Sequence, residues 1–186
     1  RRSANQVTGG EKELVVTQVG TPAEIQAVRE LLQEYIAWAF TFDPDSELAP
    51  TFQNMEQELA TLPGIYAPPA GCLMLATHEG HAAGCFALKR HDATTGELKR
   101  LYVRPAFRGQ NIGRRLVTAV VAAARESGYR RLVLDSHMSM TKAHSLYEEA
   151  GFRKIGAPAN FPEKTKAIAV FMEMNLKSGD PGRTRD

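Results

Sequence analysis

Apolar residues recur at helical spacing between Asn111 and Glu126. The residues that fall at every third or fourth position of this stretch are Ile112, Leu116, Ala119, Val120 and Ala123. Because this spacing gathers side chains on one face of a helix, the pattern predicts a helix from about Asn111 to Glu126. Ser127-Gly128 provides the signal that ends it.

The clearest helix start lies near the N-terminus. Thr21-Pro22-Ala23-Glu24 is a capping box with proline at the first helical position. The apolar residues that follow at helical spacing are Ile25, Val28, Leu32, Tyr35, Ile36 and Ala39. We therefore predict a helix that runs to about Phe42, where Asp43-Pro44-Asp45 breaks it, and two shorter helices over Phe52–Leu62 and Met140–Glu149.

Short runs rich in Val, Leu and aromatic residues, bounded by turn-forming residues, predict the strands. They are Glu13–Val19, Gly71–His78, Ala82–Arg90, Glu97–Val103, Arg131–Ser136, Phe152–Ile155 and Ala167–Leu176. A two-residue turn at Glu79-Gly80 would place Cys72 opposite Ala87 and Cys85 opposite Met74, so the two cysteines would be diagonal neighbours. The order of elements predicts an α/β or α+β domain with a mixed, mostly antiparallel sheet flanked by helices.

Composition favours a single ordinary globular domain. The chain has 186 residues, 43% of them hydrophobic and 24% charged, with a net charge of +2, so neither disorder nor a membrane class is indicated. We assign residues 13–177 to the domain, and residues 1–12 and 178–186 to flexible tails. Lys and Arg alternate with Asp and Glu along the chain, which disfavours nucleic-acid binding. The absence of a long apolar run or a secretory leader predicts a cytoplasmic protein without membrane contact, in which Cys72 and Cys85 are buried free thiols.

The loop Arg108-Gly109-Gln110-Asn111-Ile112-Gly113 delivers the start of the long helix directly after a strand. Unpaired N–H groups in a first helical turn, together with the positive end of the helix dipole, bind phosphate or pyrophosphate groups well. The loop lacks the Gly-Lys-Ser/Thr ending of a P-loop, which disfavours a nucleotide triphosphatase.

This RGQNIG loop resembles the R/Q-x-x-G-x-G/A signature of the GNAT superfamily of N-acetyltransferases. The flanking stretches ELKRLYV and SLYEEAGF, the latter Ser145–Phe152, agree in kind and in order. The resemblance implies the acyl-CoA N-acyltransferase fold and acetyl-CoA as co-substrate. The sequence departs from the family pattern twice: Asn111 stands where the first glycine is usual, and Met140 stands where many members have an asparagine that contacts CoA. Asn111 would need a glycine-like backbone conformation, which asparagine tolerates better than most residues.

The resemblance also implies where the CoA would bind. The backbone of the loop would hold the pyrophosphate, and the side chain of Arg108 or Arg114 would add charge-assisted hydrogen bonds. The strand that carries Leu101, Tyr102 and Val103 would splay from its neighbour after a bulge, so that the pantetheine arm pairs with its main chain and the N–H of Val103 binds the developing oxyanion. The predicted cofactor-binding residues are Leu101, Tyr102, Val103, Arg108, Gly109, Gln110, Asn111, Ile112, Gly113 and Arg114.

Two residues are predicted to move protons. Tyr147, in the LYxxxGF pattern, corresponds to the tyrosine that protonates the departing thiolate in this family, although packing alone would also explain a buried helix tyrosine. Glu97 lies six residues before Val103, the offset at which the histone-acetyltransferase branch of the superfamily carries its glutamate base. A solvated carboxylate at a strand end, with an ordered water as the base, is the alternative. The five histidines show no metal-ligand spacing, so no metal is expected.

These patterns predict an N-acetyltransferase in which an amine attacks acetyl-CoA directly in a ternary complex, since no cysteine is placed to form an acetyl-enzyme. The alternative is a non-catalytic GNAT-like sensor or interaction module that binds acyl-CoA. A pyrophosphate- or nucleotide-binding domain unrelated to CoA would leave SLYEEAGF unexplained. The acceptor is a small-molecule or peptide amine, and an exposed edge on the final strand would allow a homodimer.

The walls of the acceptor site are expected over residues 40–55 and 156–166. Residues there that could attract a cationic amine, or simply be solvated, are Asp43, Asp45, Glu47 and Glu163. Aromatic residues that fill the core or else contact the substrate are Trp38, Phe40, Phe42 and Phe52.

Overall fold

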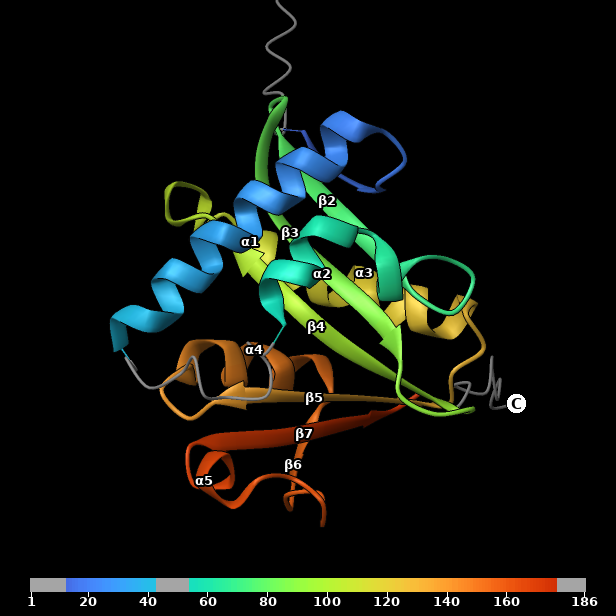
Figure 1. The fold of residues 1–186 in the computed structure, drawn as a ribbon, viewed down its shortest axis with the longest axis vertical. Coiled ribbons are helices and arrows are strands. Elements are labelled where there is room, and N and C mark those ends of the chain that lie inside the picture. Colours follow the sequence, from blue (N-terminus) through green and yellow to red (C-terminus); the bar gives the residue numbers. More distant parts are fainter. Residues whose placement is uncertain (1–12, 43–53, 177–186) are drawn as a thin grey trace, which may run out of the picture.

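The computed structural model describes residues 13–42 and 54–176. Its elements (Figure 1) are β1 (Leu14–Gln18), α1 (Pro22–Phe42), α2 (Met55–Thr61), the short 3₁₀ helix η2 (Gly64–Tyr66), β2 (Cys72–His78), β3 (His81–Arg90), β4 (Thr95–Val103), the 3₁₀ helix η3 (Pro105–Phe107), α3 (Ile112–Glu126), β5 (Arg131–His137), α4 (Thr141–Ala150), β6 (Arg153–Ile155), α5 (Glu163–Lys166) and β7 (Ala169–Asn175). The predicted tails and the Asp43-Pro44-Asp45 break lie outside the described residues, as do Glu47 and Phe52.

The strands form one seven-stranded sheet in the order β1-β2-β3-β4-β5-β7-β6. Every neighbouring pair is antiparallel except β4 with β5. The predicted mixed, mostly antiparallel sheet is therefore confirmed, and each predicted strand is found with ends shifted by a few residues. The short helix α5 was not predicted, because its four residues are too few to show a periodic pattern.

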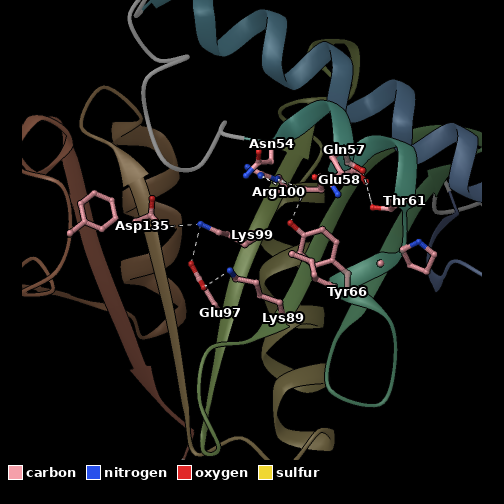
Figure 2. Close-up of a pocket in the computed structure, with 14 residues that line it drawn as sticks. Asn54, Gln57, Glu58, Thr61, Tyr66, Lys89, Glu97, Lys99, Arg100 and Asp135 are labelled. Carbon is pink, nitrogen blue, oxygen red and sulfur yellow. Dashed lines mark hydrogen bonds and ion pairs between the residues drawn. The ribbon is translucent and has the colours of Figure 1, made fainter.

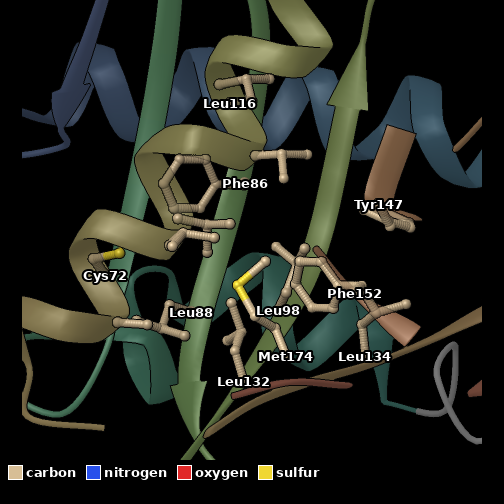
Figure 3. Packing of buried hydrophobic residues seen from close by; sticks show 14 of the residues in the cluster. Cys72, Phe86, Leu88, Leu98, Leu116, Leu132, Leu134, Tyr147, Phe152 and Met174 are labelled. Carbon is tan, nitrogen blue, oxygen red and sulfur yellow. The ribbon is translucent and has the colours of Figure 1, made fainter. Parts of the chain in front are cut away.

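Helices cover both faces of the sheet. In Figure 1, α1 and α2 lie on one side of β2, β3 and β4, and α3 lies on the other. Alternate residues of each strand therefore enter two separate cores: on β2, Leu73 and Leu75 pack toward α1, and Cys72 and Ala76 pack toward α3. Figure 3 shows the core on the α3 side, to which Phe86, Leu116, Met174 and Tyr147 of α4 all belong.

The capping box predicted at the start of α1 is present. The Glu24 carboxylate accepts hydrogen bonds from the backbone N–H groups of Gly20 (2.8 Å) and Thr21 (2.9 Å), and the Thr21 hydroxyl accepts one from the Glu24 N–H (3.2 Å). The hydrogen bonds from the backbone N–H groups of Gly20 and Thr21 hold the pKa of Glu24 below its ordinary value. The reciprocal bonds satisfy N–H groups that have no partner within the helix.

The predicted register of the β2–β3 hairpin is wrong by one residue. The turn at Glu79-Gly80 is as expected, with His78 opposite His81, but β3 has one extra residue, Ala83, between the pairs Thr77↔Ala82 and Ala76↔Gly84, and this bulge shifts the rest of the ladder. Cys72 consequently lies opposite Leu88, and Cys85 lies opposite Leu75. The two cysteines are not diagonal neighbours, because they belong to opposite faces of the sheet. Both are buried free thiols, as predicted.

The final strand is not a sheet edge. β7 pairs with β5 on one side and with β6 on the other. The expectation that an exposed edge of the last strand could pair with a second subunit is therefore wrong, because β6 returns antiparallel to β7 and covers that edge. The edges of the described sheet are β1 and β6.

Candidate functional site

The sheet opens between β4 and β5. These parallel strands pair only at Thr95↔Arg131, Gly96↔Leu132 and Glu97↔Val133. Beyond the last pair they diverge, and Figure 1 shows β4 rising away from β5 toward α1. The main chain of β4 after Glu97 therefore has β3 as a partner on one side and no strand partner on the side that faces β5.

A bulge in β4 lies just beyond this point. Cys85 of β3 lies opposite Tyr102 and Ala87 lies opposite Lys99, so β4 has one more residue than β3 between these pairs. Arg100 takes up the extra length with a left-handed φ of 58°. The bulge directs the successive side chains of Lys99 and Arg100 into the same cavity.

The three predicted pantetheine-binding residues follow this bulge. Tyr102 packs toward α1, whereas Leu101 and Val103 contact the core on the α3 side. Gly84 lies opposite Val103, and a Cβ at Gly84 would lie 2.5 Å from the carbonyl oxygen of Tyr102, so β3 approaches this part of β4 closely. The bulge and the splay predicted for this strand are both present.

Asn111 has the glycine-like conformation that the loop requires. Its φ of 63° and ψ of 9° are left-handed, and it caps the N-terminus of α3. Gly109 is also left-handed, with φ of 79°. Within the described chain, no hydrogen bond occupies the backbone N–H groups of Ile112, Gly113 and Arg114. This first turn can therefore donate to an anion.

Helix α4 packs closely against the start of α3. A Cβ on Gly113 would lie 3.1 Å from Cδ2 of Leu146, so the glycine is needed for this close packing. Arg114 forms an exposed ion pair with Glu149 at 2.5 Å. The predicted anion site and Tyr147 are therefore held on two helices in direct contact.

The Arg108 side chain, a predicted pyrophosphate ligand, contacts β4 and α1 in this structure. Its Nε donates to the carbonyl of Val103 at 3.0 Å, and its guanidinium lies 5.1 Å from the centroid of the Trp38 ring and 5.9 Å from that of Tyr102. Its backbone N–H donates to the carbonyl of Pro105 at 3.2 Å. The residue ties the loop to β4 and α1, and Trp38 packs against the α1 core.

Tyr147 is buried on α4, 7% exposed, with its ring against Phe152 at a centroid distance of 5.7 Å. Its hydroxyl has no hydrogen bond to any residue in the described ranges. Burial raises the pKa of Tyr147 well above its ordinary value, and the charges of Tyr35 and Asp135 raise this pKa further. A protonated hydroxyl beside the opening between β4 and β5 can donate a proton.

Glu97 lies in a strongly cationic environment. Its carboxylate lies 3.0 Å from Nζ of Lys99, 3.3 Å from Nζ of Lys89 and 3.6 Å from Nδ1 of His91. Burial alone would raise the pKa of Glu97, but the two lysines outweigh it and hold the pKa below its ordinary value. The carboxylate is therefore ionised at neutral pH and is a weak proton acceptor.

A cavity of about 520 Å³ lies on the α2 side of the opening (Figure 2). Lysine and arginine side chains from β3 and β4 enter it together with carboxylates from α2, β4 and β5. Its charged lining residues are Glu58, Lys89, Glu97, Lys99, Arg100 and Asp135. The sequence reasoning missed all of these except Glu97. The sequence feature that could have identified three of them is a charged residue inside an otherwise apolar strand. These are Lys99 and Arg100 in LKRLYV and Asp135 in RLVLDS.

Lys99 bridges the two strands where they separate. Its Nζ lies 3.0 Å from the Glu97 carboxylate on β4 and 3.2 Å from Oδ1 of Asp135 on β5, and Figure 2 shows it between them. Burial would lower the pKa of Lys99, but Asp135 and Glu97 outweigh it and raise the pKa. Lys99 is therefore a fixed positive charge at the cavity wall.

The second departure from the family pattern, Met140, caps α4. Its sulfur accepts a hydrogen bond from the Ser136 hydroxyl at 3.4 Å, and the same hydroxyl lies 3.1 Å from Nε2 of His144. These contacts fix the connection from β5 to α4.

The described residues contain neither a candidate metal-binding cluster nor a candidate membrane-spanning helix. No cluster of three or more His, Cys, Asp or Glu side chains there could hold a metal ion. None of the described helices is both long enough and apolar enough to cross a membrane.

The family model of the acetyltransferase (GNAT) family matches residues 26–152, and the chain therefore belongs to this family. An uncharacterized N-acetyltransferase of Schizosaccharomyces pombe is 35% identical over 140 residues, which cover 74% of this chain and 82% of that protein. The N-acetylaspartate synthetase of Danio rerio is 32% identical over 109 residues, 58% of this chain but only 39% of that protein. The PaiA N-acetyltransferase of Thermoplasma acidophilum, solved with coenzyme A, shares the fold, with a TM-score of 0.67 and 17% identity over 88% of this chain and 99% of its own. The predicted acyl-CoA N-acyltransferase fold is thus confirmed.

Proposed function

We propose that the protein transfers the acetyl group of acetyl-CoA directly to an amine bound in the cavity beside β4. The observation that carries the proposal is the opening between β4 and β5, because a cavity lined by six charged side chains lies beside it. An acyl carrier that enters on the α3 side would reach the cavity through this opening.

The chain offers suitable groups along this path. The N–H groups of the first turn of α3, behind Asn111, suit a pyrophosphate. The unpaired edge of β4 around Leu101 and Val103 suits the amide groups of a pantetheine arm, and the N–H of Val103 would donate to the thioester carbonyl oxygen. CoA in the solved PaiA structure and the N-acetyltransferase names of relatives support this co-substrate.

Tyr147 would protonate the departing thiolate. Its hydroxyl is buried, holds its proton, and has no competing hydrogen bond to the described part of the chain. Glu97, the base predicted from the sequence, lines the cavity beside β4, and its role as the base stays a prediction.

The cavity favours a small polar acceptor. Three cationic side chains and three carboxylates line it, so the formal charges balance, and a molecule that carries an ammonium beside other polar groups would find partners for each. An amino acid, a polyamine and a peptide N-terminus all have such groups. The name of the Danio rerio relative adds L-aspartate to the amines that should be tried.

The test has two stages. Calorimetric titration with acetyl-CoA, with adenosine triphosphate as the control ligand, should show saturable binding of acetyl-CoA alone. CoA release should then be followed with a thiol reagent while L-aspartate, L-lysine, spermidine and an alanyl peptide are offered as acceptors. Folded protein that binds no acetyl-CoA would overturn the proposal.

The second candidate function, an acyl-CoA sensor without turnover, predicts a different outcome. Acetyl-CoA would bind, yet no amine would release CoA faster than the protein-free control. The buried Tyr147 hydroxyl beside the opening between β4 and β5 favours the enzyme, because a sensor needs no proton donor at that place.

A further inference from the structure

We propose that Asp135, on β5, binds the ammonium group of the acceptor and takes its proton. This assignment deepens the proposed function and rests on it. It places the base on the opposite side of the strand opening from Glu97.

The position of Asp135 follows from strand register. Glu97↔Val133 is the last pair between β4 and β5, so Lys99 and Asp135 occupy the next positions on the same face. Their side chains, 3.2 Å apart, span the opening as the strands diverge. A thioester that passes through the opening would therefore enter the cavity beside Asp135.

Asp135 also interacts electrostatically with Tyr147. Its charge is one of the causes that raise the pKa of Tyr147 on the other side of the sheet, and it acts on Tyr35 of α1 in the same way. No such coupling joins Glu97 to Tyr147. An amine that binds beside Asp135 would thus have a proton acceptor at the point where β4 and β5 separate.

The three carboxylates of the cavity differ in how far protein cations neutralise them. Glu58 accepts hydrogen bonds from Nε and Nη2 of Arg100, and the Glu97 carboxylate lies 3.3 Å from Nζ of Lys89 and 3.0 Å from Nζ of Lys99. Among described residues, Asp135 has one ion-pair partner, Lys99, and shares it with Glu97. Asp135 therefore has the most capacity left for a substrate cation. Its side chain is 17% exposed, so a ligand in the cavity can reach it.

In the proposed reaction, each proton and each electron pair has a defined destination. Asp135 takes one proton from the ammonium, and the freed nitrogen lone pair forms the new bond to the thioester carbonyl carbon. As the bond from carbon to sulfur breaks, its electron pair goes to sulfur, which takes the proton of the Tyr147 hydroxyl. The second proton of the nitrogen restores Tyr147, and Asp135 releases its proton to water. One acetylated amine, one CoA thiol and one free proton result.

The experiment compares four proteins: wild type, Asp135→Asn, Glu97→Gln and Glu126→Gln. Glu126 is an exposed carboxylate at the end of α3, away from the cavity, and serves as the control. Each protein is assayed for CoA release with L-aspartate, L-lysine, spermidine and the alanyl peptide. Each is also titrated with acetyl-CoA, and its CoA complex is titrated with every amine that the wild type acetylates.

For each such amine, Asp135→Asn should lower kcat/KM by roughly 100-fold or more, the usual effect of losing a general base. It should weaken amine binding to the CoA complex and leave acetyl-CoA affinity unchanged. Glu97→Gln should cost less than Asp135→Asn, and Glu126→Gln should match the wild type. A kcat/KM for Asp135→Asn within threefold of the wild type, or a larger loss in Glu97→Gln, would overturn the assignment but leave the proposed function standing. Wild-type protein that binds acetyl-CoA and acetylates no amine would overturn both.

Discussion

The guanidinium of Arg100 donates two parallel hydrogen bonds, each 2.9 Å long, to the carboxylate of Glu58. The Tyr66 hydroxyl donates to the same carboxylate at 2.8 Å. The Arg100 side chain is only 4% exposed, so the pair is buried, and it joins α2 to the bulge of β4. This contact positions the wall of the acceptor cavity that α2 provides.

Removing one member of this buried pair should be costly. We expect Glu58→Gln to lower the free energy of unfolding by about 3 kcal/mol, because it removes the carboxylate charge that accepts two hydrogen bonds from the buried Arg100 guanidinium. Urea denaturation measures the change. The matched control is Glu148→Gln, which breaks the exposed 3.2 Å pair with Lys154 and should cost less than about 1 kcal/mol. Equal losses in the two variants would contradict the structural role of the Arg100–Glu58 pair.

The same pair should make stability depend on pH. Burial by itself raises the pKa of Glu58, but the hydrogen bonds and charge of Arg100 outweigh it and hold the pKa below its ordinary value of 4.5. A carboxyl group whose pKa is lower in the folded state stabilises the fold above its unfolded pKa and loses that contribution as the pH falls. The wild type should therefore lose its advantage over Glu58→Gln below about pH 4.5. Urea unfolding of both proteins from pH 6 to pH 3 measures this; a constant difference would argue against it.

Tyr147→Phe should separate chemistry from stability. The hydroxyl has no hydrogen-bond partner in the described structure, so its removal should change the free energy of unfolding by less than about 0.5 kcal/mol. Loss of the proton donor should lower kcat by roughly 100-fold, with acetyl-CoA affinity unchanged. Stopped-flow CoA release and calorimetry measure these quantities. A variant as fast as the wild type would show that Tyr147 is a packing residue.

Asn111 offers a test of the loop conformation. Its left-handed φ of 63° costs alanine about 1 kcal/mol and costs glycine nothing. We therefore expect Asn111→Ala to lower both stability and acetyl-CoA affinity, and Asn111→Gly to bind acetyl-CoA at least as well as the wild type. Calorimetric titration of the three proteins gives the order. Weaker binding by the glycine variant than by the alanine variant would indicate that the asparagine side chain itself contacts the ligand.

Much of the fold could be predicted because its signals are local. The capping box at Thr21–Glu24, the helical spacing after Ile112 and the turn at Glu79-Gly80 each occupy a few neighbouring residues, and the structure confirms all three. The hairpin register was wrong because a bulge leaves no local pattern in a run of small residues, here around Ala82, Ala83 and Gly84. The final strand was wrongly taken for an edge because β6, which covers it, is three residues long.

Local sequence signals predict the element order apart from the short helix α5, the family signature and the left-handed loop before α3, since these depend on contacts within one turn or one strand. Which charged side chains share the cavity depends on the tertiary structure. Lys99 and Asp135 are far apart in the chain and meet because β4 and β5 separate after three pairs. Arg100 faces Glu58 because a bulge turns its side chain toward α2. Contacts of this kind depend on the register and packing of segments that are distant in the chain, and no local sequence pattern encodes them.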